Sequence, residues 1–171
     1  MVLADAMVVI AAHEQDYWEP LCKAYQIALP ATIIEQELLY FETTKGKKGL
    51  NPSRWIKEGK VVRLEAEVND FSKVTKRLSS DSMASLDPGE LEALAILASK
   101  EYKDYLFTTA DRAAVKALGV LGWGDRGISV EELLIGMGSN KTKIAQHFTK
   151  KWFQNVLTQG FSEQHIWLRN H

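Results

Sequence analysis

Four acidic residues stand where a predicted strand gives way to a helix, or just inside the helix that follows. They are Asp5, Glu37, Glu92 and Asp111. Ligands of an open α/β sheet gather outside the carboxyl ends of its strands, so acids supplied there by separate strand–helix units can converge on one point. Four carboxylates at one point need a cation. Hard oxygen ligands suit Mg²⁺ or Mn²⁺, and these ions typically meet a substrate through its phosphates.

The elements that must position these acids alternate along the chain. Strands are predicted at 1–4, 27–29, 61–66 and 105–108, and the first of them carries Asp5 at its end. Helices are predicted at 20–25, up to residue 41, at 69–78 with Asn69 as N-cap, at 88–100 and at 111–118, where Gly119 ends the helix. The segment 45–49, rich in lysine and glycine, is predicted as a loop. This alternation predicts an α/β fold with a central parallel sheet flanked by helices on both faces.

Beyond Gly119 the chain becomes rich in glycine and then helical. Ser129 and Glu132 have the spacing of a capping box. An apolar stripe then recurs every four residues, at Ile144, Phe148, Trp152 and Val156. We expect residues 1–120 to form one domain and residues 121–171 to form a C-terminal helical extension packed on it through this stripe. A homodimer contact, or a groove for another partner, is the alternative use of the stripe.

The predicted helix that carries Glu92 is apolar on almost every side. Between residues 91 and 98, Glu92 is the only polar residue, so its side chain is expected to face the interior. A buried carboxylate requires a compensating cation. That cation is either a metal ion or a basic side chain from elsewhere in the chain.

Two acids close in sequence to the candidate ligands are better explained as helix caps. Asp87 and Glu90, separated by a proline and a glycine, have the spacing of an N-terminal capping box, which assigns Glu90 to the backbone. Thr32 and Glu35 have the same spacing, which leaves Glu37 free for chemistry.

Composition sets broad bounds on the protein. At 171 residues with 46% hydrophobic content and a net charge of -1, the chain can bury the core of one domain with an appendage. Cys22 is the only cysteine, which excludes an internal disulfide and fits a reducing compartment. No charged leader opens the sequence, and no apolar segment reaches the ~18 to 20 residues that span a bilayer. We therefore expect a cytoplasmic protein without a membrane segment.

Positive charge is concentrated in one stretch of the chain. Its cations are Lys45, Lys47, Lys48, Arg54, Lys57, Lys60 and Arg63. The stretch either contacts the phosphates of RNA or is a solvated loop, and Trp55 is its only base-stacking side chain. Elsewhere, Arg112 either steadies a phosphate or lies on a helix surface. The segment 136–142 resembles a P-loop superficially, but Asn140 replaces the glycine that precedes the lysine, so we predict an interhelix loop there.

Four short segments, in this order, resemble PIN-domain proteins. They are Val2-Leu3-Ala4-Asp5-Ala6, Glu37-Leu38-Leu39, the run from Leu86 to Ala95, and Thr108-Thr109-Ala110-Asp111-Arg112. The resemblance covers about residues 1–120, and the run from Leu86 to Ala95 is its strongest part. It implies a compact PIN-like fold, three or four acids that bind one or two Mg²⁺ or Mn²⁺, and metal-dependent ribonuclease activity. Many such proteins are VapC-type toxins of a toxin–antitoxin pair, which implies an antitoxin protein as a partner.

Carried over residue by residue, the resemblance matches Asp5, Glu37, Glu92 and Asp111 to the four acids of the family, the third of which is often an aspartate. Ala6 follows the first acid where the family usually has a small polar residue. Many members have a threonine three residues before the second acid, and Ile34 stands there, so Glu35 remains an alternative to Glu37. The sequence thus predicts a Mg²⁺- or Mn²⁺-dependent endoribonuclease. The alternative is a non-catalytic PIN-like scaffold that binds RNA or protein.

Overall fold

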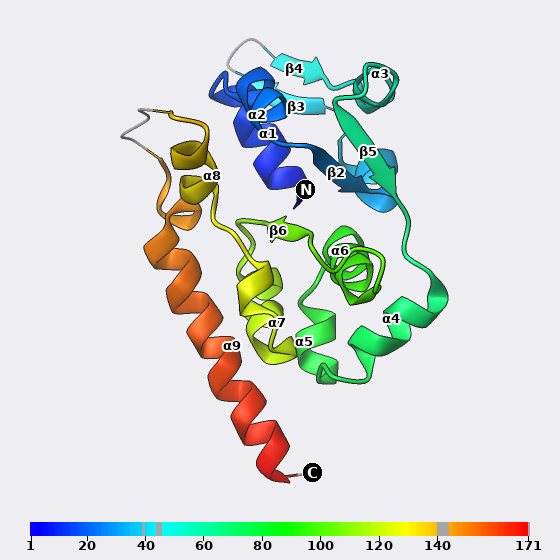
Figure 1. Cartoon of the computed structure of the whole chain (residues 1–171), viewed down its shortest axis with the longest axis vertical. Coiled ribbons are helices and arrows are strands. Elements are labelled where there is room, and N and C mark those ends of the chain that lie inside the picture. Colours follow the sequence, from blue (N-terminus) through cyan, green and yellow to red (C-terminus); the bar gives the residue numbers. More distant parts are fainter. Residues whose placement is uncertain (39, 44–45, 140–143, 171) are drawn as a thin grey trace.

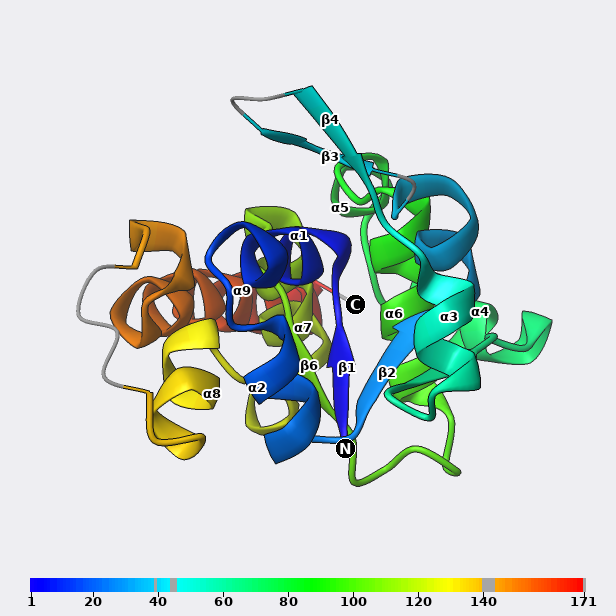
Figure 2. The same cartoon turned by 90° about the horizontal axis from the view of Figure 1, so that it is seen from above.

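A four-stranded parallel sheet forms the centre of the molecule. The computed structural model describes residues 1–38, 40–43, 46–139 and 144–170. The strands are β1 (Val2–Ala4), β2 (Ile27–Pro30), β5 (Val61–Leu64) and β6 (Leu106–Thr108), in the order β5-β2-β1-β6. Figure 2 shows β1 between β6 and β2, and all three pairings are parallel. The prediction of an α/β fold with a central parallel sheet is confirmed.

Helices cover both faces of this sheet (Figure 1). One face packs against α1 (Ala6–Glu14), α2 (Trp18–Ala24), α3 (Pro52–Lys57) and α8 (Val130–Gly136). The other face packs against α4 (Val68–Thr75), α6 (Pro88–Ala98), α7 (Arg112–Leu121) and α9 (Lys150–Asn170). Side chains of a strand alternate between faces, so Val2 and Ala4 join the first core and Leu3 joins the second.

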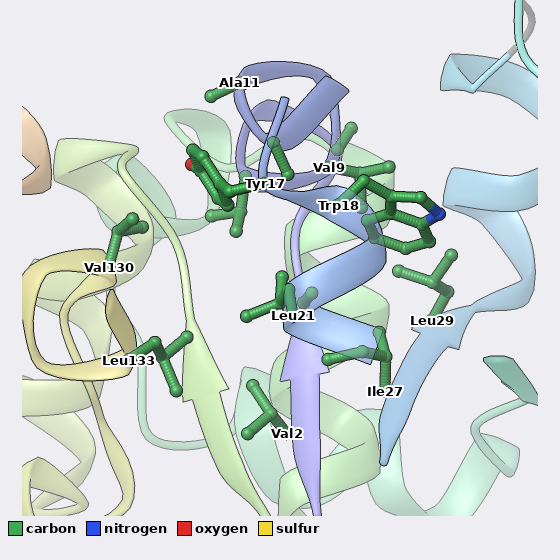
Figure 3. Close-up of a cluster of buried hydrophobic side chains, with 14 of the residues drawn as sticks. Val2, Val9, Ala11, Tyr17, Trp18, Leu21, Ile27, Leu29, Val130 and Leu133 are labelled. Carbon is green, nitrogen blue, oxygen red and sulfur yellow. The ribbon is translucent and has the colours of Figure 1, made fainter. Parts of the chain in front are cut away.

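The core of the first face is drawn in Figure 3. Leu21 of α2 lies over Val2 and Ile27 of the sheet, while Val130 and Leu133 of α8 approach from the side. All five are almost completely buried. A segment beyond residue 120 therefore completes the core that the first strands begin.

Helix α9 packs backbone to backbone against α7 where two glycines meet. A Cβ built on Gly119 would stand 2.9 Å from the Cα of Gly160, and a Cβ on Gly160 would stand 2.9 Å from the Cα of Gly119. This close approach buries Phe153 and Val156 of α9 in the second core. Within the described residues, the predicted apolar stripe is thus covered by the chain itself, although Phe148 lies in a 3₁₀ turn (Gln146–Phe148) before α9 begins.

Arg126 ties the segment after α6 to the segment after α7. It lies in a 3₁₀ turn (Gly124–Arg126) and is half-buried. Its guanidinium donates to the carbonyl oxygens of Leu97 at 2.6 Å, of Tyr105 at 3.1 and 3.2 Å, and of Tyr102. One residue further, Gly127 bridges Phe107 in parallel, and the amide of Ile128 donates to the Phe107 carbonyl at 3.0 Å. The outer edge of β6 is therefore covered by the chain that follows α7.

The prediction of a helix up to residue 41 followed by a loop is wrong. A short π-helix (Ile33–Glu37) ends well before that point, and β3 (Tyr40–Thr43) pairs antiparallel with β4 (Gly46–Gly49). The aromatic and β-branched residues of β3 favour a strand over a helix. Figure 2 shows this hairpin projecting from the body of the molecule.

Two helix boundaries also differ from prediction. Helix α7 runs through Gly119 to Leu121 and ends at Gly122, whose φ of 73° is left-handed, because Gly119 serves helix packing instead. Helix α4 has Glu67 rather than Asn69 as N-cap, and a short α5 (Ser80–Ala84) follows it. Of the segment that resembles a P-loop, Gly136 ends α8, and residues 140–142 lie outside the described residues. In the described ranges, no helix combines the length and apolar character needed to cross a membrane.

Candidate functional site

Two predicted ligands meet through a threonine at the carboxyl ends of β1 and β6. Asp5 follows β1 directly and is only 3% exposed. The hydroxyl of Thr109 donates to Asp5 Oδ2 at 2.8 Å and accepts the amide of Asp111 at 3.0 Å. No role for Thr109 is predicted from the sequence. Its only sequence signal is its place between the end of a strand and an acid.

Asp111 also caps the helix that it precedes. Its Oδ1 accepts the amides of Ala113 at 2.6 Å and Ala114 at 3.2 Å. These two bonds fix the position of the Asp111 carboxylate at the start of α7, beside Thr109.

The N-terminus of α6 brings a further pair of acids to this edge. Asp87 Oδ1 accepts the amide of Glu90 at 2.7 Å, and Glu90 Oε2 accepts the amide of Asp87 at 3.0 Å, which confirms the predicted capping box. Glu90 is also only 3% exposed. Burial, the largest cause, and the charges of Asp111, Asp87 and Asp5 together raise the pKa of Glu90 to about 9, against the effect of the cap bond.

Glu37 reaches the same place from the π-helix after β2. Its carboxylate lies against Gly89 in the first turn of α6, where a Cβ would overlap Glu37 Oε1. Burial, followed by the charges of Asp87 and Asp5, raises the pKa of Glu37 to about 7. Glu35, the alternative second acid, is directed elsewhere and pairs with Arg63 at 2.8 Å.

Glu92 is bonded to the backbone. As predicted, it is buried, with 4% exposure. Its Oε2 accepts the amide of Thr32 at 2.8 Å and its Oε1 accepts the amide of Ala66 at 3.3 Å, so backbone donors after β2 and β5 occupy the carboxylate. The predicted capping box of Thr32 and Glu35 is wrong, because the Thr32 side chain makes no cap bond. The structure therefore brings together three of the predicted ligands, Asp5, Glu37 and Asp111. Glu92 instead binds backbone amides, and Glu90 lies near Asp5.

These acids form what we call the acid cluster: Asp5, Glu37, Asp87, Glu90 and Asp111. Burial, the largest cause, and the charges of Asp87 and Asp111 together raise the pKa of Asp5 to about 6, while the Thr109 bond opposes the rise. Mutual repulsion of this kind is relieved by a cation, so the oxygen donors and the charge of the cluster fit Mg²⁺ or Mn²⁺. Among the described residues, no three His, Cys, Asp or Glu side chains already stand as a ligand set. Side-chain rotations would have to complete one.

The basic stretch is more neutralised than its sequence suggests. Arg54 pairs with Glu58 at 2.6 Å, Lys60 with Glu19 at 2.8 Å, and Arg63 with Glu35 and Glu65. Trp55 is only 7% exposed and packs against Trp18 and His13, so it offers no open stacking face. Lys47 of the hairpin lies 4.0 Å from the ring centre of Tyr40, and Lys45 lies outside the described residues.

Comparison with models of protein families, with curated proteins and with solved structures finds no match for this chain.

Proposed function

We propose that this protein is a Mg²⁺- or Mn²⁺-dependent endoribonuclease with a PIN-like fold. The observation that carries the proposal is the acid cluster: carboxylates from four separate segments gather at the carboxyl edge of the sheet, and burial and mutual charge raise the pKa values of Asp5, Glu37 and Glu90. The resemblance of the sequence to PIN-domain proteins supports RNA as the substrate. The resemblance alone supports a toxin role with an antitoxin partner.

We assign the metal-holding role to Asp5, Glu37, Glu90 and Asp111. Glu90 replaces Glu92 of the sequence-based set, because Glu92 already accepts two backbone amides and Glu90 lies among the acids. Thr109 is a positioning residue, since its hydroxyl fixes Asp5 Oδ2 and the amide that precedes α7. A bound Mg²⁺ or Mn²⁺ would supply positive charge to the phosphodiester and make an attacking water more acidic.

The acids themselves do two things in this proposal. Asp5, buried beside Thr109, keeps one oxygen bonded and directs its charge into the cluster. Burial and the charges of Asp87 and Asp5 raise the pKa of Glu37 to about 7 in the metal-free protein, so this carboxyl holds a proton near neutrality that a bound cation would displace. Asp111 is held in position by its cap bonds to the amides of Ala113 and Ala114.

The proposal is tested by incubating purified protein with mixed-sequence single-stranded RNA in Mg²⁺, Mn²⁺ or EDTA. We expect cleavage with either metal, none in EDTA, and none with Asp5→Asn. Glu35→Gln is the matched control, because Glu35 belongs to an exposed ion pair outside the acid cluster. Metal should also raise the melting temperature, by mass action worth ~2.7 kcal/mol at a hundredfold excess over its dissociation constant. A melting temperature that does not change with metal, together with uncut RNA, would refute the proposal that the protein is a metal-dependent endoribonuclease.

A non-catalytic scaffold is the second candidate, and one observation favours it. No ready ligand set of three stands among the described side chains. Such a scaffold would bind RNA or a protein in EDTA as well as in Mn²⁺ and would leave RNA intact. The same incubation, followed by recovery of the RNA, separates the two candidates.

A further inference from the structure

A polar cavity opens beside the acid cluster, between α5, α7 and α9. Its volume is about 390 Å³. Three serines from α5 and its flanks line it, Ser79, Ser82 and Ser85, together with Lys116 and Glu163. Hydroxyls with one cation and few apolar groups suit a sugar–phosphate chain better than an apolar ligand.

Two walls of this polar cavity adjoin the acids directly. Ala113 lines it, and the amide of Ala113 is the donor that binds Asp111 Oδ1 at 2.6 Å. Ser85, just after α5, also lines it and stands two residues before Asp87. The two segments that carry Asp111 and Asp87 therefore also contribute to the wall of the cavity.

Helix α9 holds the two cations that follow Asp111 on α7. Lys116 pairs with Glu163 at 2.5 Å, and Arg112 donates to Gln159 at 2.5 Å. Arg112 and Lys116 are four residues apart, as are Gln159 and Glu163, so each pair shares one helix face. Lys116 lies three residues before Gly119 and Glu163 three residues after Gly160, so the glycine contact between α7 and α9 sets this pairing.

From these contacts we infer that the polar cavity binds the RNA backbone next to the cleaved bond, with Lys116 on a phosphate and Glu163 as the group that the phosphate displaces. This inference rests on the proposed function. Lys116 stands five residues along α7 from Asp111, about 7.5 Å further along the helix axis, so a strand that runs past the start of α7 could reach it. In the protein without RNA, the Glu163 carboxylate pairs with the Lys116 ammonium group, which the phosphate would bind instead.

Because carboxylates also line the cavity, the two partners of the ion pair should affect RNA binding in opposite ways. Glu163 and Asp81 both line it, and both oppose a polyanion. Only Glu163 is paired with Lys116. Removing the charge of Glu163 should therefore strengthen RNA binding, whereas removing the charge of Lys116 should weaken it, although the two side chains are partners in one ion pair.

The test measures binding of a short fluorescein-labelled single-stranded RNA by anisotropy in EDTA, over a range of salt. We expect Lys116→Ala to weaken binding severalfold and to flatten the salt dependence by a slope of ~0.7, the loss of one phosphate contact. Glu163→Gln should tighten binding. Lys23→Ala on α2 and Glu14→Gln on α1 are the matched controls, because they remove one charge of each sign on the opposite face of the sheet. Melting curves of all four variants confirm that they are folded.

Equal weakening by Lys116→Ala and Glu163→Gln would assign the ion pair to stability and overturn the inference. The inference would also be overturned if Lys116→Ala left the salt dependence of RNA binding unchanged while Lys47→Ala flattened it. That result would place the RNA on the hairpin of β3 and β4. The proposed function is judged separately, by Mn²⁺-dependent cleavage in the wild-type protein. If the wild-type protein cleaves RNA with Mn²⁺ but Lys116→Ala changes neither KM nor RNA binding, the proposed endoribonuclease function stands and the inference that the cavity binds RNA is wrong.

Discussion

Glu37 and Gly89 contact each other so closely that no side chain fits at position 89. A Cβ there would overlap Glu37 Oε1 and would stand 2.6 Å from Ile33 Cγ1. Gly89→Ala should therefore push the flexible Glu37 carboxylate out of the acid cluster while α6 remains formed, because alanine is a better helix residue than glycine. We expect RNA cleavage to fall at least tenfold, a change of about 1.4 kcal/mol in the barrier, and the melting temperature to fall as well, because the added methyl group also overpacks against the buried Ile33.

Gly49→Ala provides the comparison for this substitution. The space around Gly49 is open within 4 Å, so an added methyl group meets nothing there. It should leave cleavage unchanged. Full activity in Gly89→Ala would mean that Glu37 does not need its present position, and the assignment of Glu37 would be withdrawn.

Glu90 and Glu92 should respond to the same substitution in opposite ways. Glu92→Gln replaces a carboxylate that accepts two backbone amides by a group with one acceptor oxygen, so it should destabilise the fold by about 1–3 kcal/mol. Glu90→Gln should abolish metal-dependent cleavage with a smaller loss of stability. Thermal melts and the RNA assay measure both effects. The sequence alone predicted the reverse, with Glu92→Gln inactive and Glu90→Gln near wild type, so the pair of variants decides between the two assignments.

The stability of the metal-free protein should fall as the pH rises from acid to neutral. The pKa values of Asp5 and Glu37 in the folded protein are about 6 and about 7, above those of an unfolded chain, so the folded state holds these protons more tightly. Their contribution is fully present below the unfolded pKa values and is lost as the pH rises through the folded ones. Melting temperatures between about pH 5 and 8 should show the decline, and saturating Mn²⁺ should reduce it because the metal competes with the protons.

Asp5→Asn with Glu37→Gln supplies the control for this pH dependence. With both titrating groups removed, the decline over the same range should become shallower. A decline of wild-type size in the double variant would show that other groups cause it.

The sequence predicted the central sheet well and the acid cluster only in part. Strands of the sheet are short apolar runs followed by helices, and that local pattern is enough to place Asp5 and Asp111 at the carboxyl edge. The orientation of Glu90 and Glu92 was not accessible in this way. The capping box predicts that the Glu90 carboxylate is used only to bind the backbone, yet Glu90 caps α6 and also lies buried among the acids. Glu92 was expected to need a cation, whereas two amides from distant segments satisfy it.

The hairpin was missed for a different reason. Its strands pair only with each other, and β4 consists of glycine and lysine, which have low strand propensity. The pairing with β3 therefore overrides local preference. The role of Thr109 was likewise hidden, because a hydroxyl that joins residues 5 and 111 depends on the register of β1 with β6.

Arg126→Met should destabilise the protein by about 2–4 kcal/mol, because it removes the side-chain donor of the Leu97, Tyr102 and Tyr105 carbonyls, of which Tyr102 keeps only the amide of Tyr105. Chemical denaturation measures this change. Arg54→Met is the comparison, since Arg54 pairs with Glu58 at the surface, and an exposed pair of this kind contributes little. Equal effects of the two substitutions would contradict a tying role for Arg126.

The cover over the outer edge of β6 affects the order in which a newly made chain can fold. A nascent chain that has reached residue 120 contains all four strands of the sheet but lacks Arg126 and the Gly127–Ile128 segment that caps the last strand. Until those residues leave the ribosome, β6 presents unpaired backbone groups to solvent, a surface on which other strands can add. We therefore expect release of the chain at residue 120 to give aggregation, and folding to become cooperative only once α8 and α9 have emerged.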